Sequence, residues 1–154
     1  MKVDLIAGAR PNFMKIAPLY RAMNEWNWTK RPVQLSPRFI YTGQHTDPVM
    51  SQMLFMTLGL PPPIFKIDSV GNGLEQFTQV ITQYSGWIKS NRPAMVVVVG
   101  DVFSTLAAAY VAKLEKLPLC HVEAGLRSRN RNMPEEINRL MVDSISDLLL
   151  TPSW

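Results

Sequence analysis

The chain has 154 residues and a mass of 17.4 kDa, with 47% hydrophobic and 18% charged residues. These proportions suit one globular domain with its own core and exclude a disordered or collagen-like chain. No apolar run, residues 94–99 included, approaches the roughly 20 residues that cross a bilayer. Asp4 and Arg10 interrupt the apolar stretch that a secretion signal requires. We therefore expect a cytoplasmic protein without a membrane partner.

The cysteine and charge content excludes further kinds of protein and site. Cys120 is the only cysteine, so no intrachain disulfide forms, and one cysteine with two histidines makes no zinc pattern. The net charge is +4, but the positive residues are scattered rather than lined up along one helix. We therefore predict no metal site and no nucleic-acid partner. The local group Arg127, Arg129 and Arg131 is a basic loop that also suits a phosphate-bearing small molecule.

The first half of the chain predicts two strands and two helices. Residues 1–8 are an apolar strand that ends at a glycine, and apolar side chains then recur every three or four residues as on a helix over residues 12–26. A second strand is expected over residues 38–42 and a short helix over residues 49–58. Three consecutive prolines begin a segment, residues 61–73, that we predict to be a loop.

The second half repeats the alternation more strongly. Residues 95–99, MVVVV, are typical of a strand buried on both faces in a parallel sheet. The other elements expected here are helices over residues 74–90, 104–116 and 134–146, strands over residues 118–124 and 148–151, and a polar loop over residues 125–133.

This alternation predicts an α/β fold with a doubly wound, mostly parallel, Rossmann-like sheet. No internal repeat or linker is visible, so residues 1–154 are expected to form one domain. The last predicted strand is not followed by a covering helix before Trp154. We therefore expect this domain to belong to a longer protein.

Ligands of open α/β sheets bind outside the carboxyl ends of the strands. Arg10 and Lys15 follow the first strand and bring positive charge to a helix N-terminus, where an anion is stabilised, although both also fit as ordinary surface charges. Neither GxGxxG nor GxxxxGK[ST] occurs, so no dinucleotide or P-loop cofactor is expected.

Two acids follow later strands at the same rim. Asp101 comes directly after the valine strand, where it is either a site carboxylate or the cap of the next helix. Glu123 ends an apolar strand and must be paired or face a ligand. His121 in that strand is interpreted as a hydrogen-bonded core residue, and His45, after the second strand, as a loop residue that hydrogen-bonds rather than a catalytic one.

A further pair of acids begins the helix after the polar loop. Glu135 and Glu136 suit the charge preference of a helix N-terminus, so a structural role explains both. Adjacent helical residues point about 100° apart, so at most one of the two faces a site at the rim.

Together these segments are specific to one family. GARPNFMKIAPL, YTGQH, GDVFSTLAAA, HVEAGLRS and MPEEINR, in this order, resemble the N-terminal domain of the non-hydrolysing UDP-N-acetylglucosamine 2-epimerases over nearly the whole chain. The resemblance implies the N-terminal half of a glycosyltransferase-B-type fold, with the active site in a cleft between two Rossmann-like domains. It also implies an enzyme that interconverts UDP-N-acetylglucosamine and UDP-N-acetylmannosamine, the latter for bacterial cell-surface polysaccharides.

The resemblance also assigns residues. The family eliminates UDP to leave 2-acetamidoglucal and then adds UDP back after protonation of the opposite face, with no metal or redox cofactor. Asp101, Glu123 and Glu135 match its acidic catalytic residues, and Arg10 and Lys15 match its substrate-contacting cations.

Other implications concern regulation, length and assembly. Gln44 and His45 match a loop near an allosteric site or the cleft, although Asp47 replaces a glutamine that is common in regulated members. The family chain is more than twice as long as this one, so the second, nucleotide-binding domain is missing here and the chain alone is expected not to epimerise. A homodimer through this domain is a further expectation. The alternative is a stand-alone module that binds sugar nucleotides or a partner without turnover.

Overall fold

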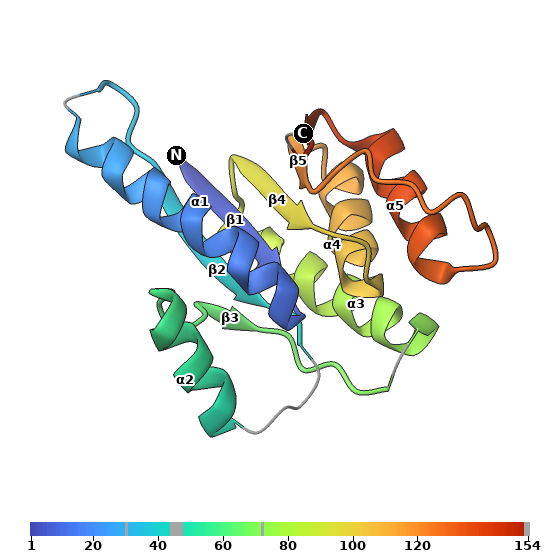
Figure 1. The fold of residues 1–154 in the computed structure, drawn as a ribbon. Coiled ribbons are helices and arrows are strands. Elements are labelled where there is room, and N and C mark those ends of the chain that lie inside the picture. Colours follow the sequence, from blue (N-terminus) through green and yellow to red (C-terminus); the bar gives the residue numbers. More distant parts are fainter. Residues whose placement is uncertain (30, 44–47, 72, 153–154) are drawn as a thin grey trace.

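The computed structural model describes residues 1–29, 31–43, 48–71 and 73–152. Strands and helices alternate from end to end (Figure 1). The first half contains β1 (Lys2–Ala7), α1 (Arg10–Trp28), β2 (Ser36–Tyr41), α2 (Pro48–Leu58) and β3 (Phe65–Lys66). The second half contains α3 (Gly73–Asn91), β4 (Met95–Val99), α4 (Phe103–Leu114), β5 (Leu119–Val122), α5 (Pro134–Ile145) and β6 (Leu148–Leu150).

The strands form one parallel sheet in the order β3-β2-β1-β4-β5-β6. From β1 the chain moves outward through β2 to β3, and it then returns to the other side of β1 and moves outward again through β4, β5 and β6. Leu5 of β1 accordingly pairs with Phe39 of β2 on one side and with Val97 of β4 on the other. The reversal of strand order between β1 and β4 is the topological switch point where open α/β sheets bind ligands.

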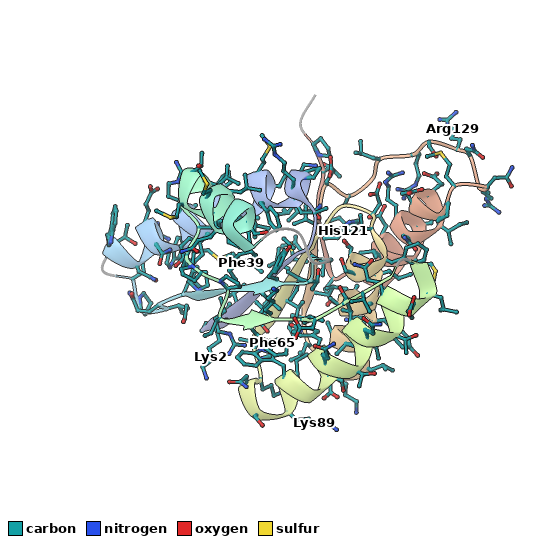
Figure 2. The ribbon with its side chains drawn as sticks, turned by 90° about the horizontal axis from the view of Figure 1, so that it is seen from below. Lys2, Phe39, Phe65, Lys89, His121 and Arg129 are labelled. Atoms are coloured by element: carbon teal, nitrogen blue, oxygen red, sulfur yellow. The ribbon has the colours of Figure 1, made fainter. Side chains whose placement is uncertain are left out.

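Helices cover both faces of the sheet. Figures 1 and 2 show α1 and α2 on one face and α3 on the other; α4 packs beside α3, and α5 packs beside α4. Alternate valines of β4 serve the two cores: Val97 and Val99 pack with the α1 side, whereas Val96 and Val98 pack with the α3, α4 and α5 side. The continuous apolar run of β4 follows from this burial on both faces.

The predicted α/β class and the alternation of elements are confirmed. The one error is the segment 61–73, which was expected to be a loop but contains the two-residue edge strand β3, where Phe65 pairs with Ile40. A strand this short carries no alternation that a sequence pattern can reveal. No helix in the described part of the chain is long and apolar enough to cross a bilayer.

Candidate active site

A cavity of about 240 Å³ opens at the switch point of the sheet. Its walls come from the N-terminal end of α1, from the turns after β4 and β5, and from α5. The lining residues are Ala9, Pro11, Asn12, Lys15, Gly100, Asp101, Val102, Glu123, Leu126 and Arg139. The cavity therefore joins segments that are more than a hundred residues apart in the sequence.

Glu123 enters this cavity from the end of β5 and forms an ion pair with Lys15 of α1. The side chains are 27% and 35% exposed, so the pair is accessible from the cavity. Glu123 has a φ of 68°, in the left-handed region that non-glycine residues rarely adopt. Its main-chain N–H donates to the carbonyl oxygen of Leu150 in β6 at 2.9 Å, which helps to hold this conformation. Non-glycine residues in this conformation concentrate at functional sites.

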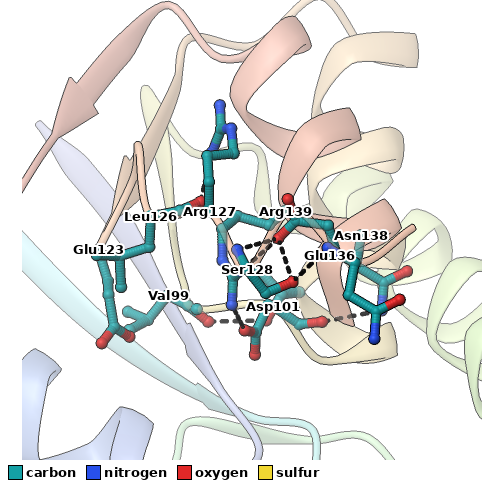
Figure 3. Close-up of polar contacts among 12 residues, drawn as sticks. Val99, Asp101, Glu123, Leu126, Arg127, Ser128, Glu136, Asn138 and Arg139 are labelled. Carbon is teal, nitrogen blue, oxygen red and sulfur yellow. Dashed lines mark hydrogen bonds and ion pairs between the residues drawn. The ribbon is translucent and has the colours of Figure 1, made fainter. Parts of the chain in front are cut away.

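Asp101 forms the second ion pair of the cavity, with Arg139 of α5. The Nη1 of the same guanidinium lies 2.7 Å from Oε2 of Glu136, so Arg139 bridges two carboxylates (Figure 3). Asn138 donates from Nδ2 to the main-chain oxygen of Asp101 at 2.8 Å. Two neighbouring residues of α5 thus hold both the side chain and the backbone of Asp101.

The turn after β4 depends on Gly100 and on the buried side-chain amide of Asn12. Asn12 is 5% exposed, accepts the N–H of Ala9 at 3.2 Å and donates to the carbonyl of Val99 at 3.3 Å. Gly100 has a φ of +73°, and a Cβ there would lie 3.0 Å from Nδ2 of Asn12. A side chain at position 100 would therefore be strained and would press on the amide that ties α1 to β4.

Glu136 is a structural acid rather than a cavity residue. It is 2% exposed, and its carboxylate accepts the N–H groups of Ser128 and Arg129 at 2.9 and 3.2 Å (Figure 3). The Ser128 N–H is the main reason why the pKa of Glu136 lies below its usual value, with further lowering from the Ser128 hydroxyl, the Arg129 N–H and Arg139 that outweighs burial. Glu136 therefore fastens the loop over residues 125–133 to α5.

The structure unites three of the predicted site residues: Lys15, Asp101 and Glu123 all line the cavity. Arg10 and Glu135 are exposed and lie outside the lining set, each at the N-terminal end of a helix that contributes to the cavity. Gln44 and His45, predicted as a cleft or allosteric loop, lie outside the described residues.

The structure shows whether Asp101 and His121 have the purely structural roles that the sequence allowed. Asp101 does not cap α4, because the N-cap residue is Val102 and the Asp101 carboxylate pairs with Arg139 instead. His121 is a satisfied core residue as predicted, since it is fully buried and both ring nitrogens have partners.

Sequence reasoning missed Arg139, Asn138 and Asn12. Arg139 and Asn138 follow the acids of MPEEINR on one helix, and Arg139 is three residues after Glu136, a spacing at which opposite charges meet. That spacing was a usable signal for the Glu136 contact. The contacts to Asp101 and Val99 span 38 and 87 residues, and nothing local in the sequence indicates them.

The chemistry available in the cavity is proton transfer beside anion-binding groups. Two carboxylates and two cations face one space, next to the N-terminal end of α1, whose free N–H groups favour anions. Within the part of the chain that the structure describes, no three His, Cys, Asp or Glu side chains are grouped so that they could hold a metal ion.

Known proteins are similar to this chain in sequence and in fold. A family profile described as UDP-N-acetylglucosamine 2-epimerase matches residues 28–154. A UDP-2,3-diacetamido-2,3-dideoxy-D-glucuronate 2-epimerase of Pseudomonas aeruginosa is 40% identical over 154 residues, which are 99% of this chain and 42% of that protein. A UDP-N-acetylglucosamine 2-epimerase of Methanocaldococcus jannaschii is 38% identical over 155 residues, which are 99% of this chain and 40% of that one.

The solved structures agree with these relatives. The crystal structure of the M. jannaschii UDP-GlcNAc 2-epimerase in complex with UDP-GlcNAc and UDP has a TM-score of 0.87 and 38% identity, covering 99% of this chain and 41% of that one. The chain thus spans about 40% of the length of these relatives, and the matching region is their N-terminal portion. By sequence and by fold, the chain belongs to the UDP-N-acetylglucosamine 2-epimerase family.

Proposed function

We propose that this chain supplies the residues for acid-base catalysis in an enzyme that interconverts UDP-N-acetylglucosamine and UDP-N-acetylmannosamine. The observation that carries the proposal is the cavity at the switch point, where Asp101 and Glu123 face one space from two neighbouring strands. Epimerisation at a sugar C2 needs a base on one face of the ring and an acid on the other. Membership of the family supports the same reaction.

The proposed route begins with loss of the proton on C2 to one carboxylate. The electron pair of the C2–H bond forms the C1–C2 double bond, and the bond between C1 and the diphosphate oxygen breaks with its electrons leaving on UDP. The products are 2-acetamidoglucal and UDP. In the return step the second acid protonates C2 from the opposite face, and the UDP oxygen adds to C1.

Positive groups are needed because negative charge develops on the departing diphosphate. Lys15 lines the cavity, and Arg10 begins α1 beside the lining residues Ala9 and Pro11. We assign both to the diphosphate. Glu135 is assigned to proton transfer by its motif, and its exposed position one turn before Arg139 leaves it available to a substrate held partly by a second domain.

The relatives also name a second substrate. The 40% identical relative is a UDP-2,3-diacetamido-2,3-dideoxy-D-glucuronate 2-epimerase, so the same change at C2 on an acidic sugar is a second candidate reaction. Both sugars carry a C2 acetamido group and UDP, which leaves the proposed chemistry unchanged. A cytoplasmic location, which suits the buried thiol of Cys120, and a homodimer through this domain stay predictions.

The decisive experiment joins this chain to the remaining length of a relative. A chimera is made in which this chain replaces the matching N-terminal 40% of the M. jannaschii enzyme. Chimera, parent enzyme and isolated 154-residue chain are each given UDP-N-acetylglucosamine or the diacetamido-glucuronate nucleotide, and the products are separated by chromatography. We expect turnover of one nucleotide by the chimera and none by the isolated chain.

The alternative, a binding module without turnover, makes a different prediction. It requires that the isolated chain bind a UDP-sugar at micromolar strength in a calorimetric titration while the folded chimera turns over neither nucleotide. That combination would overturn the enzymatic proposal.

A further inference from the structure

A buried ion pair lies directly behind the cavity, formed by residues that the proposed reaction does not use. His121 of β5 is fully buried, with Nδ1 lying 2.6 Å from Oδ1 of Asp143 and Nε2 lying 2.8 Å from the carbonyl oxygen of Gly100. The other oxygen of Asp143 accepts the N–H of Gly125 at 3.1 Å and lies 2.6 Å from the guanidinium of Arg127.

These contacts determine where the protons are. A carbonyl oxygen only accepts, so Nε2 of His121 must carry a proton and donate it to Gly100. Asp143 is placed to be ionised: burial works to raise its pKa, but the contacts from Arg127, His121 and the Gly125 N–H outweigh burial and lower it. An ionised carboxylate also only accepts, so Nδ1 carries a proton as well.

We propose that His121 carries a proton on both ring nitrogens and is paired, as a buried imidazolium, with the Asp143 carboxylate, and that this pair positions the turns carrying Asp101 and Glu123. The protons on both ring nitrogens follow from their contacts and from the ionisation of Asp143, whereas the catalytic consequence rests on the proposed function.

The positions of the partners explain why the pair acts on the site. Gly100 directly precedes Asp101, and Gly125 follows Glu123 by two residues, so each of the two turns is fixed by one hydrogen bond. Asp143 lies one helical turn beyond Arg139 on α5, and α5 therefore holds Asp101 from two points. Neither His121 nor Asp143 lines the cavity, but His121 bonds to Gly100, which does, so the pair acts by positioning.

The residues packed around the ring leave Asp143 as the carboxylate that contacts it. Val98 and Leu149 are the register neighbours of His121 in β4 and β6, and neither is charged. On α4 the titratable side chains are Tyr110, which is exposed, and Lys113, which pairs with Asp147. Among the described contacts, Asp143 on α5 is therefore the charged group that contacts the ring, and Arg127 contacts the other oxygen of Asp143.

Nuclear magnetic resonance of the 154-residue chain tests the charge state without any assay of activity. The chain has two histidines, so His45→Gln in a tag-free, ¹⁵N-labelled chain leaves His121 as the only imidazole. We expect both ring nitrogens of His121 to carry protons at neutral pH. A single protonated nitrogen at neutral pH would overturn the proposal.

Asp143→Asn is the matched variant, because it removes the charge and can keep every hydrogen bond. The carboxamide donates to Nδ1 and still accepts from Gly125 and Arg127, so His121 should become neutral with the proton on Nε2. An imidazole that stays doubly protonated in this variant would show that Asp143 does not hold the charge.

The positioning role is tested in the chimera. His121→Leu removes both donors and should lower kcat by about 10- to 100-fold with KM changed by less than about threefold, because misplacement of the acids affects chemistry more than nucleotide binding. Asp143→Asn should cost less, because its hydrogen bonds survive. An unchanged kcat in His121→Leu, or a raised KM alone, contradicts positioning.

A chimera without activity would count against the proposed function but not against the pair. In that case amide hydrogen exchange of the isolated chain decides: His121→Leu should speed exchange at Gly100 and at residues 123–125 but not in Lys2–Ala7. Equal exchange in both regions would overturn positioning.

Discussion

Each acid of the cavity is paired with a cation that comes from a different element. Lys15 on α1 holds Glu123, and Arg139 on α5 holds Asp101. Such pairing fixes the direction in which a carboxylate points.

The first prediction concerns the acids themselves. Asp101→Asn and Glu123→Gln keep the side-chain shapes but remove the proton-transfer groups, so each should lower kcat of the chimera by about 10²-fold or more. Circular dichroism and urea unfolding of the isolated chain check that the fold survives. A Glu123→Gln variant that stays active but unfolds more easily would make Glu123 a structural residue.

The second prediction concerns Arg139, which contacts two carboxylates through a planar guanidinium. Arg139→Lys keeps the charge but cannot reproduce both contacts, so kcat of the chimera should fall by about tenfold or more. Arg92→Lys is the matched control, because Arg92 pairs with Glu115 at an exposed site away from the cavity and should leave kcat unchanged. An equal change of kcat in the two variants would show that Arg139 has no special role in holding the two carboxylates.

At the scale of elements, α5 and the loop before it act as one unit because of Glu136. Glu135→Gln and Glu136→Gln are a matched pair of adjacent substitutions. Glu136→Gln should lower the melting temperature of the chain by several degrees at neutral pH, because it weakens the hold on Ser128, Arg129 and Arg139. Glu135 is exposed, and its substitution should not change the melting temperature.

The contribution of Glu136 to the stability of the fold depends on pH. The pKa of Glu136 is lower in the folded than in the unfolded chain, so its contribution is complete above the ordinary value of 4.5 and is lost as the pH falls through the folded value. The stability gap between Glu136→Gln and the unsubstituted chain should therefore close in acid. A gap that persists below the folded value would contradict this assignment.

The amino end of the sheet contains a second polar cluster with the opposite pH behaviour. Asp4 is fully buried, accepts from Nε of Arg38 at 2.6 Å and from the hydroxyl of Tyr84 at 2.9 Å. Burial raises the pKa of this carboxyl more than Arg38 and Tyr84 lower it. The cluster ties β1 to β2 and α3 far from the cavity.

Arg38→Met should lower the free energy of unfolding, because it leaves the buried Asp4 carboxylate without its charged partner. Removing one partner of a buried pair costs about 3–5 kcal/mol, which urea unfolding at about pH 7 can measure. Without Arg38 the pKa of Asp4 is raised further above its unfolded value. The variant therefore loses stability as the pH rises, and its loss relative to the unsubstituted chain should shrink as the pH falls. A loss independent of pH would mean that packing of Arg38, and not its charge, matters.

The elements could be predicted because their signals are local. The valines of β4 and the spacing of Phe13, Ile16 and Ala17 in α1 report burial through periodicity. Lys15, Asp101 and Glu123 could be placed at one rim because parallel strands share an edge. β3 was missed because two residues have no period, and Arg139 was missed because its partner Asp101 is 38 residues away.

At the scale of the whole molecule, the site is made where the two halves of the chain meet. α1 belongs to the half that winds outward to β3, and β4, β5 and α5 belong to the half that winds to β6. The chain covers about 40% of its relatives, and the proposal assigns proton transfer to this part and much of the nucleotide binding to a second domain. Roles that depend on that second domain lay beyond the reach of this sequence.

The central claim is that Asp101 and Glu123 move the proton on C2 of the sugar. The most direct measurement is a reaction of the chimera with UDP-N-acetylglucosamine in D₂O, followed by mass spectrometry and NMR of the recovered nucleotides. The account predicts one deuterium at C2 of the UDP-N-acetylmannosamine formed, with incorporation lost in Asp101→Asn and in Glu123→Gln. Epimerisation that retains the original hydrogen at C2, or full exchange in both variants, would contradict it.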